Sequence, residues 1–177
     1  MSVQPELQDL LDKQAIHEVM MRYCRGVDRQ DAELLRSTYW PDAHDDHGLY
    51  SGSRDGFVDW VISFLRENFS TVIHKIGNEL VEVHGDIAFS ESYFTGYYDF
   101  VQDGRPHTRM SCGRYVDRFE RRDGEWRIAR RTVVNDWGRI DPLDTPSVRS
   151  IGGGLFPDDP VYALRPDYLE YQAPGSP

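Results

Sequence analysis

Apolar residues in the first third of the chain recur at three- and four-residue spacing, which is the period of an amphipathic helix. The first stripe comprises Leu7, Leu10, Leu11, Ile16, Val19, Met20 and Tyr23. Gly26 is predicted to end this helix, and a short second helix is predicted over residues 31–39, before Pro41. The stripe of a third helix comprises Phe57, Trp60, Val61, Phe64 and Leu65.

The period of the pattern changes to two after these helices. Residues 78–100 predict two strands joined at residues 84–86, and residues 107–137 predict two more joined at residues 122–124. Both joints contain Asp-Gly or Gly-Asp, which are hairpin signals between β-rich runs. The segment AHDDHGLYSG predicts a short strand and a turn between the second and third helices. Helices followed by an antiparallel meander predict an α+β fold, with helices packed on one face of a curved sheet.

Length and charge narrow the class of protein. A chain of 177 residues suggests one domain, and its formal net charge of −10 gives no basic face for a nucleic-acid partner. Its apolar runs are too short to span a bilayer, and MSVQPELQDLL does not have the pattern of a secretory signal. Cys24 and Cys112 form no CxxC pair. We therefore expect a cytoplasmic chain without a membrane partner.

Composition changes near the C-terminus. From about residue 141, Pro and Gly become frequent, as in IGGGLFPDDP and QAPGSP. We therefore predict a domain over residues 1–140 and an irregular tail over residues 141–177. The tail is expected to pack on the domain or on a neighbouring subunit.

Asp28 and His74 are candidates for acid–base chemistry. Asp28 precedes the second predicted helix, and either Asp28 or Asp31 could cap that helix. His74 precedes the first long predicted strand, where a histidine is usually structural. Histidine is nevertheless the side chain best suited to move protons near neutral pH. A carboxylate bonded to one ring nitrogen would fix its tautomer and stabilise the imidazolium.

The segment HDDHG, residues 44–48, is the densest polar cluster. In a strand, His44 and Asp46 would face one way, and Asp45 and His47 the other. Two histidines and two aspartates are compatible with a metal, but the alternation leaves each face short of three ligands. We predict no metal site, and a metal-dependent variant that uses His44 or His47 is the lesser alternative.

Three sets of alternate residues on the predicted strands could line a cavity. They are Glu91, Tyr93, Thr95 and Tyr97; Met110, Cys112 and Arg114; and Arg130, Thr132 and Val134. A mixture of Tyr, Met, Cys and Thr is typical of a mostly apolar pocket with a few polar anchors. The alternative is a solvent face, which is predicted for Arg127, Arg131 and Asp117. No Gly-rich phosphate loop or G-x-S-x-G motif is present, and no cofactor is predicted.

Four fragments in order, YCRGVDRQD, YWPDA, IHKIGN and GRYVDRFERRDGEWRIARR, resemble the SnoaL-like branch of the nuclear transport factor 2-like superfamily. The resemblance covers about residues 8–140. It implies a cone-shaped α+β barrel, in which a curved mixed sheet wraps a deep pocket that three N-terminal helices close. Dehydratase and dehydrochlorinase members carry a catalytic Asp–His dyad. The matching positions are Asp28, in the G-x-D turn, and His74, in the H-x-x-x-N segment.

The resemblance also implies a set of substrate-binding positions. These are Tyr23, Asp45, Tyr93, Met110, Cys112, Arg130 and Thr132. Alternation with Asp45 adds His47. Tyr97 joins Tyr93 as a counterpart of the tyrosines that scytalone dehydratase-like members place around the substrate water. The Asp-Asp-His stretch makes one wall more polar than a dehydrochlorinase pocket would suggest.

The function implied by the resemblance is that of a cofactor-independent lyase. It would release water or a small fragment such as formaldehyde from a small, largely apolar, aromatic substrate. His74 would act as general base, and Arg130, Tyr93 or His47 would assist the leaving group. A polyketide cyclase or steroid-type isomerase with the same dyad, and a non-catalytic binding module, remain alternatives. A homo-oligomer is expected, because strand faces of this fold are usually covered by another subunit.

Overall fold

The computed structural model describes residues 4–143 and 153–163. Helices α1 (Pro5–Asp28) and α2 (Ala32–Ser37) come first, followed by strands β1 (Tyr39–Asp46) and β2 (Ser51–Ser53). Helix α3 (Arg54–Asn68) then leads to four long strands. These are β3 (Thr71–His84), β4 (Ile87–Gln102), β5 (Arg105–Arg122) and β6 (Glu125–Pro142), and the short helix α4 (Pro160–Ala163) comes last.

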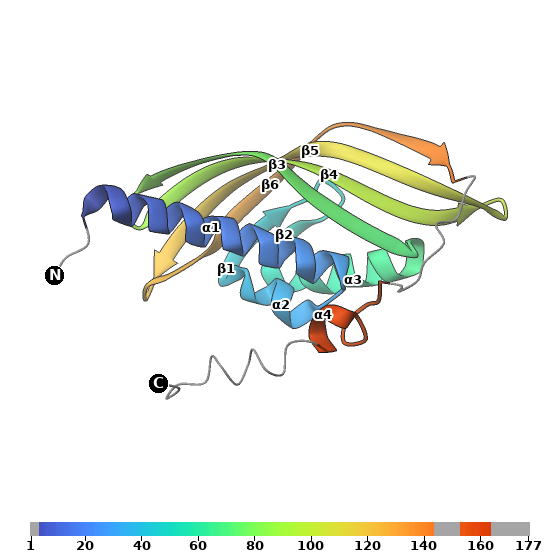
Figure 1. Ribbon diagram of the computed structural model, residues 1–177, viewed down its shortest axis with the longest axis horizontal. Helices are drawn as coiled ribbons and strands as arrows, with labels where there is room; N and C mark the ends of the chain where they lie inside the picture. The colour runs from blue at the N-terminus through green and yellow to red at the C-terminus, as the bar shows by residue number, and fades with distance from the viewer. Residues whose placement is uncertain (1–3, 144–152, 164–177) are drawn as a thin grey trace.

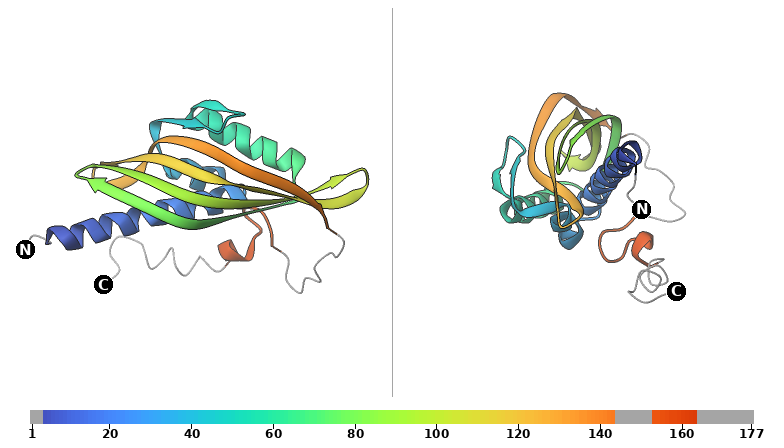
Figure 2. Two further views of the ribbon diagram at one scale, coloured as in Figure 1. Left: turned by 90° about the horizontal axis from the view of Figure 1, so that it is seen from above. Right: turned by 90° about the vertical axis from the view of Figure 1, so that its left-hand side faces the viewer.

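The six strands form one mixed sheet in the order β2-β1-β6-β5-β4-β3. Strand β1 runs parallel to β6, and every other neighbouring pair is antiparallel. The sheet curves strongly, and helices α1 to α3 lie along its concave side (Figures 1 and 2). The predicted α+β fold, a curved mixed sheet closed by three N-terminal helices, is therefore confirmed, although the edges β2 and β3 leave the barrel open.

Several predicted boundaries are wrong by a few residues. Helix α1 continues through Gly26 to Asp28, because Gly26 serves close packing of the helix rather than its termination. Tyr39 opens β1 instead of closing α2, and its fully buried ring packs in the core. His74 lies within β3, which begins at Thr71 and pairs with β4 from its first residue.

A β-bulge in β6 determines which side chains reach the concave side. Arg118 pairs with Arg130, and the next residue of β5, Phe119, pairs with Ile128, so Ala129 is an extra residue. An extra residue reverses the face to which the following side chains point. Ile128 faces the helices before the bulge and Arg131 faces them after it, and both are fully buried. The exposed Arg130 falls on the convex side.

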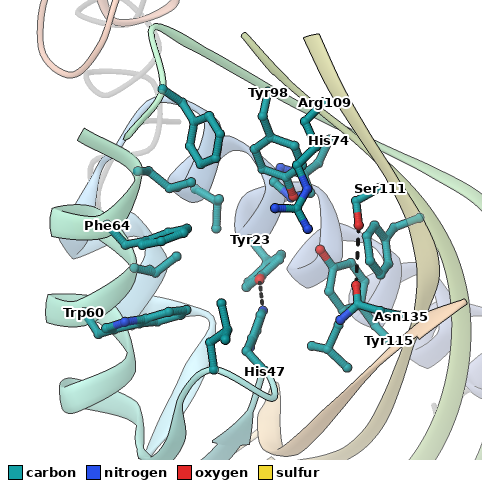
Figure 3. A pocket seen from close by; sticks show the side chains of 17 residues that line it. Tyr23, His47, Trp60, Phe64, His74, Tyr98, Arg109, Ser111, Tyr115 and Asn135 are labelled. Atoms are coloured by element: carbon teal, nitrogen blue, oxygen red, sulfur yellow. Dashed lines mark hydrogen bonds between the residues drawn. The ribbon is translucent and has the colours of Figure 1, made fainter. Parts of the chain in front are cut away.

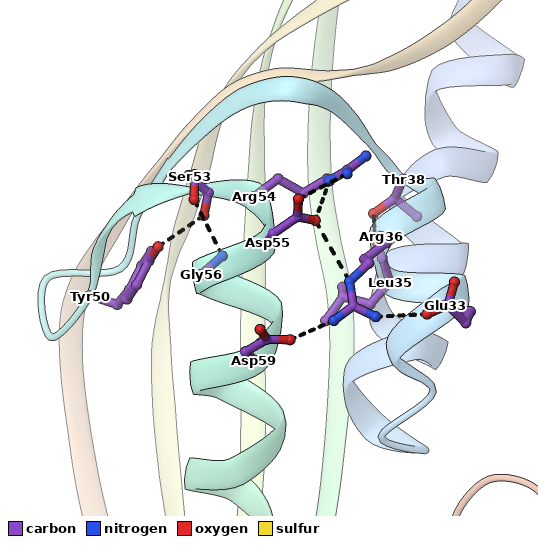
Figure 4. Close-up of polar contacts among 10 residues, drawn as sticks. All are labelled: Glu33, Leu35, Arg36, Thr38, Tyr50, Ser53, Arg54, Asp55, Gly56 and Asp59. Carbon is purple, nitrogen blue, oxygen red and sulfur yellow. Dashed lines mark hydrogen bonds and ion pairs between the residues drawn. The ribbon is translucent and has the colours of Figure 1, made fainter.

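Polar contacts fix the joint between α2 and α3 (Figure 4). Asp31 caps α2 by accepting the Leu34 N–H at 3.0 Å, and Ser53 caps α3 by accepting the Gly56 N–H at 3.3 Å. Arg36 of α2 pairs with Asp59 of α3. Exposed pairs of this kind contribute roughly 0.2–1 kcal/mol each, so they orient α3 more than they stabilise the fold.

The segment 153–163 packs against the turn between α1 and α2. The Phe156 N–H donates to the Arg29 carbonyl at 2.8 Å, and Asp159 pairs with the Arg29 side chain at 3.2 Å. The Tyr162 hydroxyl donates to Asp31 at 2.9 Å. Backbone N–H groups of Gly154 and Val161 lower the pKa of Asp159. Residues 144–152 and 164–177 of the predicted tail lie outside the described residues. Within the described ranges, no helix has the length and apolarity to cross a membrane.

Gly26→Ala is expected to destabilise the protein. A Cβ at this position would lie 2.9 Å from the Leu35 backbone nitrogen, closer than packed atoms allow. The added methyl group would push α1 away from α2, which should lower the free energy of unfolding by about 1–3 kcal/mol. Chemical denaturation would measure this change. The control is Gly77→Ala, whose Cβ would come no closer than 3.7 Å to a neighbour. Equal stability of the two variants would contradict this account of Gly26.

Candidate active site

A cavity of about 140 Å³ lies between α3 and the concave side of the sheet. Its wall combines aromatic and aliphatic side chains with polar groups from both histidines and several tyrosines (Figure 3). The lining residues are Tyr23, Val27, His47, Leu49, Trp60, Val61, Phe64, Leu65, Phe69, His74, Phe94, Tyr98, Arg109, Ser111, Tyr115, Val133 and Asn135. An engineered cavity of about 150 Å³ holds benzene, so this space suits a single aromatic ring.

The end of α1 places Asp28 against His74 of β3. One carboxylate oxygen lies 2.7 Å from His74 Nδ1, and the other accepts the His74 backbone N–H at 3.0 Å. The His74 side chain is 5% exposed and that of Asp28 is 12% exposed. A carboxylate can only accept a hydrogen bond, so Nδ1 carries a proton, and in the neutral ring Nε2 keeps its lone pair.

Tyr98 of β4 meets the free nitrogen of His74. Its hydroxyl lies 3.0 Å from Nε2, and its ring stands edge-on to the imidazole. Burial, followed by the negative charge of Asp28, raises the pKa of Tyr98 well above its ordinary range. The hydroxyl therefore stays protonated and donates a hydrogen bond to Nε2, which places a proton-bearing group beside the nitrogen that faces the cavity.

A second His–carboxylate pair stands on another wall. Asp45 is fully buried, accepts from the Tyr39 hydroxyl at 2.6 Å and bonds His47 Nδ1. His47 Nε2 lies 3.2 Å from the Tyr23 hydroxyl, and the His47 ring stacks on Phe57. Figure 3 shows His47 and Tyr23 meeting below the His74 end of the cavity. The pocket thus has a histidine backed by a carboxylate on each of two walls.

A buried cation supports the Tyr23 wall from behind. The Arg131 guanidinium lies 4.1 Å from the ring centre of Tyr23 and 4.2 Å from that of Tyr115. It donates two hydrogen bonds to Asp117, at 2.7 and 2.6 Å, and the side chains of both residues are fully buried. The prediction that Arg131 and Asp117 face solvent is wrong, because the bulge at Ala129 turns Arg131 inward. Burial raises the pKa of Tyr23 well above its ordinary range, while the charge of Arg131 opposes this shift.

The structure brings part of the predicted site together. Asp28 and His74 are in contact, and Tyr23, Asp45 and His47 form the neighbouring wall. Tyr23, His47 and His74 line the cavity, while each aspartate lies behind its histidine.

The other predicted positions do not line this cavity. These six predicted residues lie on the convex side of the sheet instead: Tyr93, Tyr97, Met110, Cys112, Arg130 and Thr132. On β4 and β5, the predicted residues are shifted by one position from the residues that point into the concave side. On β6, the bulge at Ala129 reverses which residues point inward. The outward phase is marked by Glu91, which pairs with Arg114 at 2.9 Å on the convex side.

Several lining residues were not predicted from the sequence. The polar ones are Tyr98, Arg109, Ser111, Tyr115 and Asn135. The alternation Phe94, Gly96, Tyr98 carries the missed signal, because these positions continue the buried phase of Ser90 and Ser92. Asn135 precedes a second bulge of β6, between the pairs Gly113–Asn135 and Cys112–Trp137.

The HDDHG cluster divides as its alternation predicts. Asp45 and His47 turn toward the core, whereas His44 Nε2 lies 3.2 Å from Ser51 and Asp46 accepts the Gly48 N–H. Over residues 4–143 and 153–163, no group of three or more His, Cys, Asp or Glu side chains is arranged to hold a metal ion.

The curved sheet, the helical cover and the pocket between them are those of the nuclear transport factor 2-like α+β fold. The chain belongs to the family described as the SnoaL-like domain, whose model matches residues 8–132. No curated protein gives a significant match.

Solved structures share the fold. A hexachlorocyclohexane dehydrochlorinase (LinA) type 2 is 22% identical, with a TM-score of 0.70 over 83% of this chain and 99% of that one. The LinA type 3 of Novosphingobium barchaimii LL02 is 21% identical, with a TM-score of 0.69 over 82% and 99% of the chains. A candidate scytalone dehydratase from Novosphingobium aromaticivorans DSM 12444 is 19% identical, with a TM-score of 0.65 over 78% and 97%.

Proposed function

We propose that this protein is a cofactor-independent lyase that releases water or a small carbonyl fragment from a small, largely apolar aromatic substrate. The observation that carries the proposal is the Asp28–His74 pair at the wall of a cavity that holds about one ring. The names of the structural relatives, a dehydrochlorinase and a candidate scytalone dehydratase, both describe eliminations and support the same reaction class.

His74 is the proposed general base. Its Nε2 lone pair removes a proton from a carbon or hydroxyl of the substrate, after the substrate has displaced the Tyr98 hydroxyl from this nitrogen. Asp28 holds the Nδ1–H tautomer and stabilises the imidazolium that forms. General-base catalysis contributes roughly 10²–10⁴-fold, and exclusion of water from the aromatic cavity strengthens the electrostatic interactions within it.

We propose that His47, backed by Asp45, is the general acid. Of the three groups considered for assisting the leaving group, only His47 lines the cavity. Protonated His47 supplies its Nε2 proton through the Tyr23 hydroxyl, 3.2 Å away, to the departing oxygen or to the carbanion left after carbon–carbon cleavage. The bond to the leaving group breaks as His74 removes a proton from the substrate. His74 thus gains one proton while His47 gives up another. An elimination uses such a pair of groups directly.

Asp28→Asn and His74→Ala are expected to fold but to lose activity. A screen of hydroxylated aromatic compounds with mass-resolved detection would first identify a substrate by loss of water or formaldehyde. We expect kcat/KM to fall by about 10²–10⁴-fold in each variant, because base strength or base orientation is lost. Full turnover by His74→Ala would refute the mechanism, and a product of unchanged mass would indicate the isomerase alternative instead.

His47→Gln and Tyr23→Phe are expected to slow the reaction according to the leaving group. With a hydroxide-like leaving group, kcat should fall by about 10²-fold or more, because the departing oxygen needs a proton. With an analogue whose leaving group is a weakly basic phenolate, the same variants should approach wild-type rates while His74→Ala stays impaired. Equal losses on both substrates would assign His47 a structural role only.

The convex side of the sheet is the proposed interface for a homo-oligomer. It carries exposed apolar side chains, among them Tyr93 at 47% and Trp137 at 54% exposure, and such patches mark interaction surfaces. Trp137→Glu should shift the sedimentation coefficient toward that of one chain, while Leu49→Glu, on an exposed loop away from this face, should not. A wild-type protein that sediments as a single chain would contradict this interface.

A further inference from the structure

Arg109 is the one permanently charged side chain that lines the cavity. It projects from the concave side of β5, and Figure 3 shows it reaching inward beside Tyr98 and His74. Within the described residues, no hydrogen bond or ion pair involves its guanidinium, and the residue is exposed to solvent at the rim of the cavity. The cavity therefore presents a cation without a protein counter-ion.

The neighbouring carboxylates do not neutralise this charge. Asp28 is engaged by His74, and Asp45 is engaged by His47 and Tyr39, and neither lines the cavity. Two other arginines of β5 are paired: Arg114 with Glu91 and Asp136, and Arg122 with Asp42 and Glu120. In a chain with 30 acidic and 20 basic residues, Arg109 therefore keeps a positive charge at the cavity that a ligand can neutralise.

Two polar groups stand on the same rim as Arg109. Ser111 is the next inward-facing residue of β5, and its hydroxyl lies 3.4 Å from the side-chain oxygen of Asn135. This orientation directs the Asn135 amide NH₂ away from Ser111, so it can donate to a ligand. A planar guanidinium matches a carboxylate, which accepts two parallel hydrogen bonds from arginine, and the Asn135 amide lines the same cavity.

We infer that Arg109, with Asn135, binds a carboxylate of the substrate, and that the substrate class is small aromatic carboxylic acids. This inference rests on the proposed function for its chemistry, though the binding it describes can be measured without turnover. The ring would fill the cavity, whose volume suits one ring, and the carboxylate would lie at the rim.

The position of Arg109 also relates the carboxylate to the base. Arg109 is the cross-strand partner of Tyr98, and the Tyr98 hydroxyl contacts His74 Nε2. Directly opposed residues have Cβ atoms about 4.5–5.5 Å apart, so a carboxylate on Arg109 lies at the His74 end of the cavity. A proton on a carbon near the carboxylate is then the one His74 removes, and the charge that develops on the carboxylate oxygens is held by Arg109.

The test compares acids with their amides. Titration calorimetry would measure the binding of benzoate and cinnamate, and of benzamide and cinnamamide, to the wild-type protein, Arg109→Gln and Arg130→Gln. Arg130 carries the same charge on the convex side and serves as the matched control. We expect the wild type and Arg130→Gln to bind each acid at least about tenfold more tightly than its amide, because hydrogen bonds to charged groups add about that much. Arg109→Gln should bind both equally.

Added salt should weaken acid binding to the wild-type protein but leave amide binding unchanged. Unchanged amide binding by Arg109→Gln would show that this variant is folded. Equal affinity of the wild type for acid and amide, no detectable binding of the acids, or an acid preference retained by Arg109→Gln would overturn the inference.

His74→Ala separates this inference from the proposed lyase function. If His74→Ala turns over normally while Arg109→Gln loses the acid preference, the lyase mechanism fails and the carboxylate subsite stands. If His74→Ala is inactive and Arg109→Gln keeps the preference, the mechanism stands and the subsite is refuted.

Discussion

The contact between Asp28 and His74 is the interaction on which the site depends. One carboxylate accepts both the ring N–H and the backbone N–H of the same histidine, and this joins the end of α1 to β3. An acidic residue at the C-terminus of a helix is disfavoured by the helix dipole, by about 0.3–1 kcal/mol, so Asp28 does not stabilise its own helix. Asp31 supplies the cap for α2, which leaves Asp28 available for the histidine. The negative end of the α1 dipole also favours a cationic imidazole.

The charges of the pocket are arranged by depth. Both aspartates lie behind histidines, so the cavity meets imidazole rings and tyrosine hydroxyls rather than bare carboxylates. Arg131 and Asp117 neutralise each other behind Tyr23, and Arg109 places one positive charge at the rim. Charge interactions are stronger where aromatic walls exclude water, so a few polar groups can direct proton transfer. This layout fits a ligand with an apolar ring and one anionic end.

Much of this arrangement was predictable from the sequence. The helical period, the change to a period of two and the Asp-Gly turns predicted the elements, and the ordered motifs pointed to Asp28 and His74. Alternation alone placed Asp45 and His47 on one face. The phase of the long strands was not predictable, because both faces of this sheet carry apolar residues: Tyr97 and Tyr98 are adjacent and look alike, yet only Tyr98 reaches the cavity. A single extra residue, Ala129, reversed the assignment of Arg130 and Arg131. Gly26 was predicted to end the first helix, because the sequence does not distinguish a glycine needed for close packing from one needed for helix termination.

The central claim is that Asp28 holds His74 in the tautomer that turns a basic Nε2 toward the cavity. The most direct measurement is the ¹⁵N NMR spectrum of the His74 ring at a pH where it is neutral, assigned with His74→Gln. We expect Nδ1 to be protonated and Nε2 not, and we expect Asp28→Asn, whose amide can donate as well as accept, to shift the population toward the other tautomer. A His74 ring protonated on Nε2 in the wild-type protein, or a spectrum unchanged by Asp28→Asn, would contradict the account.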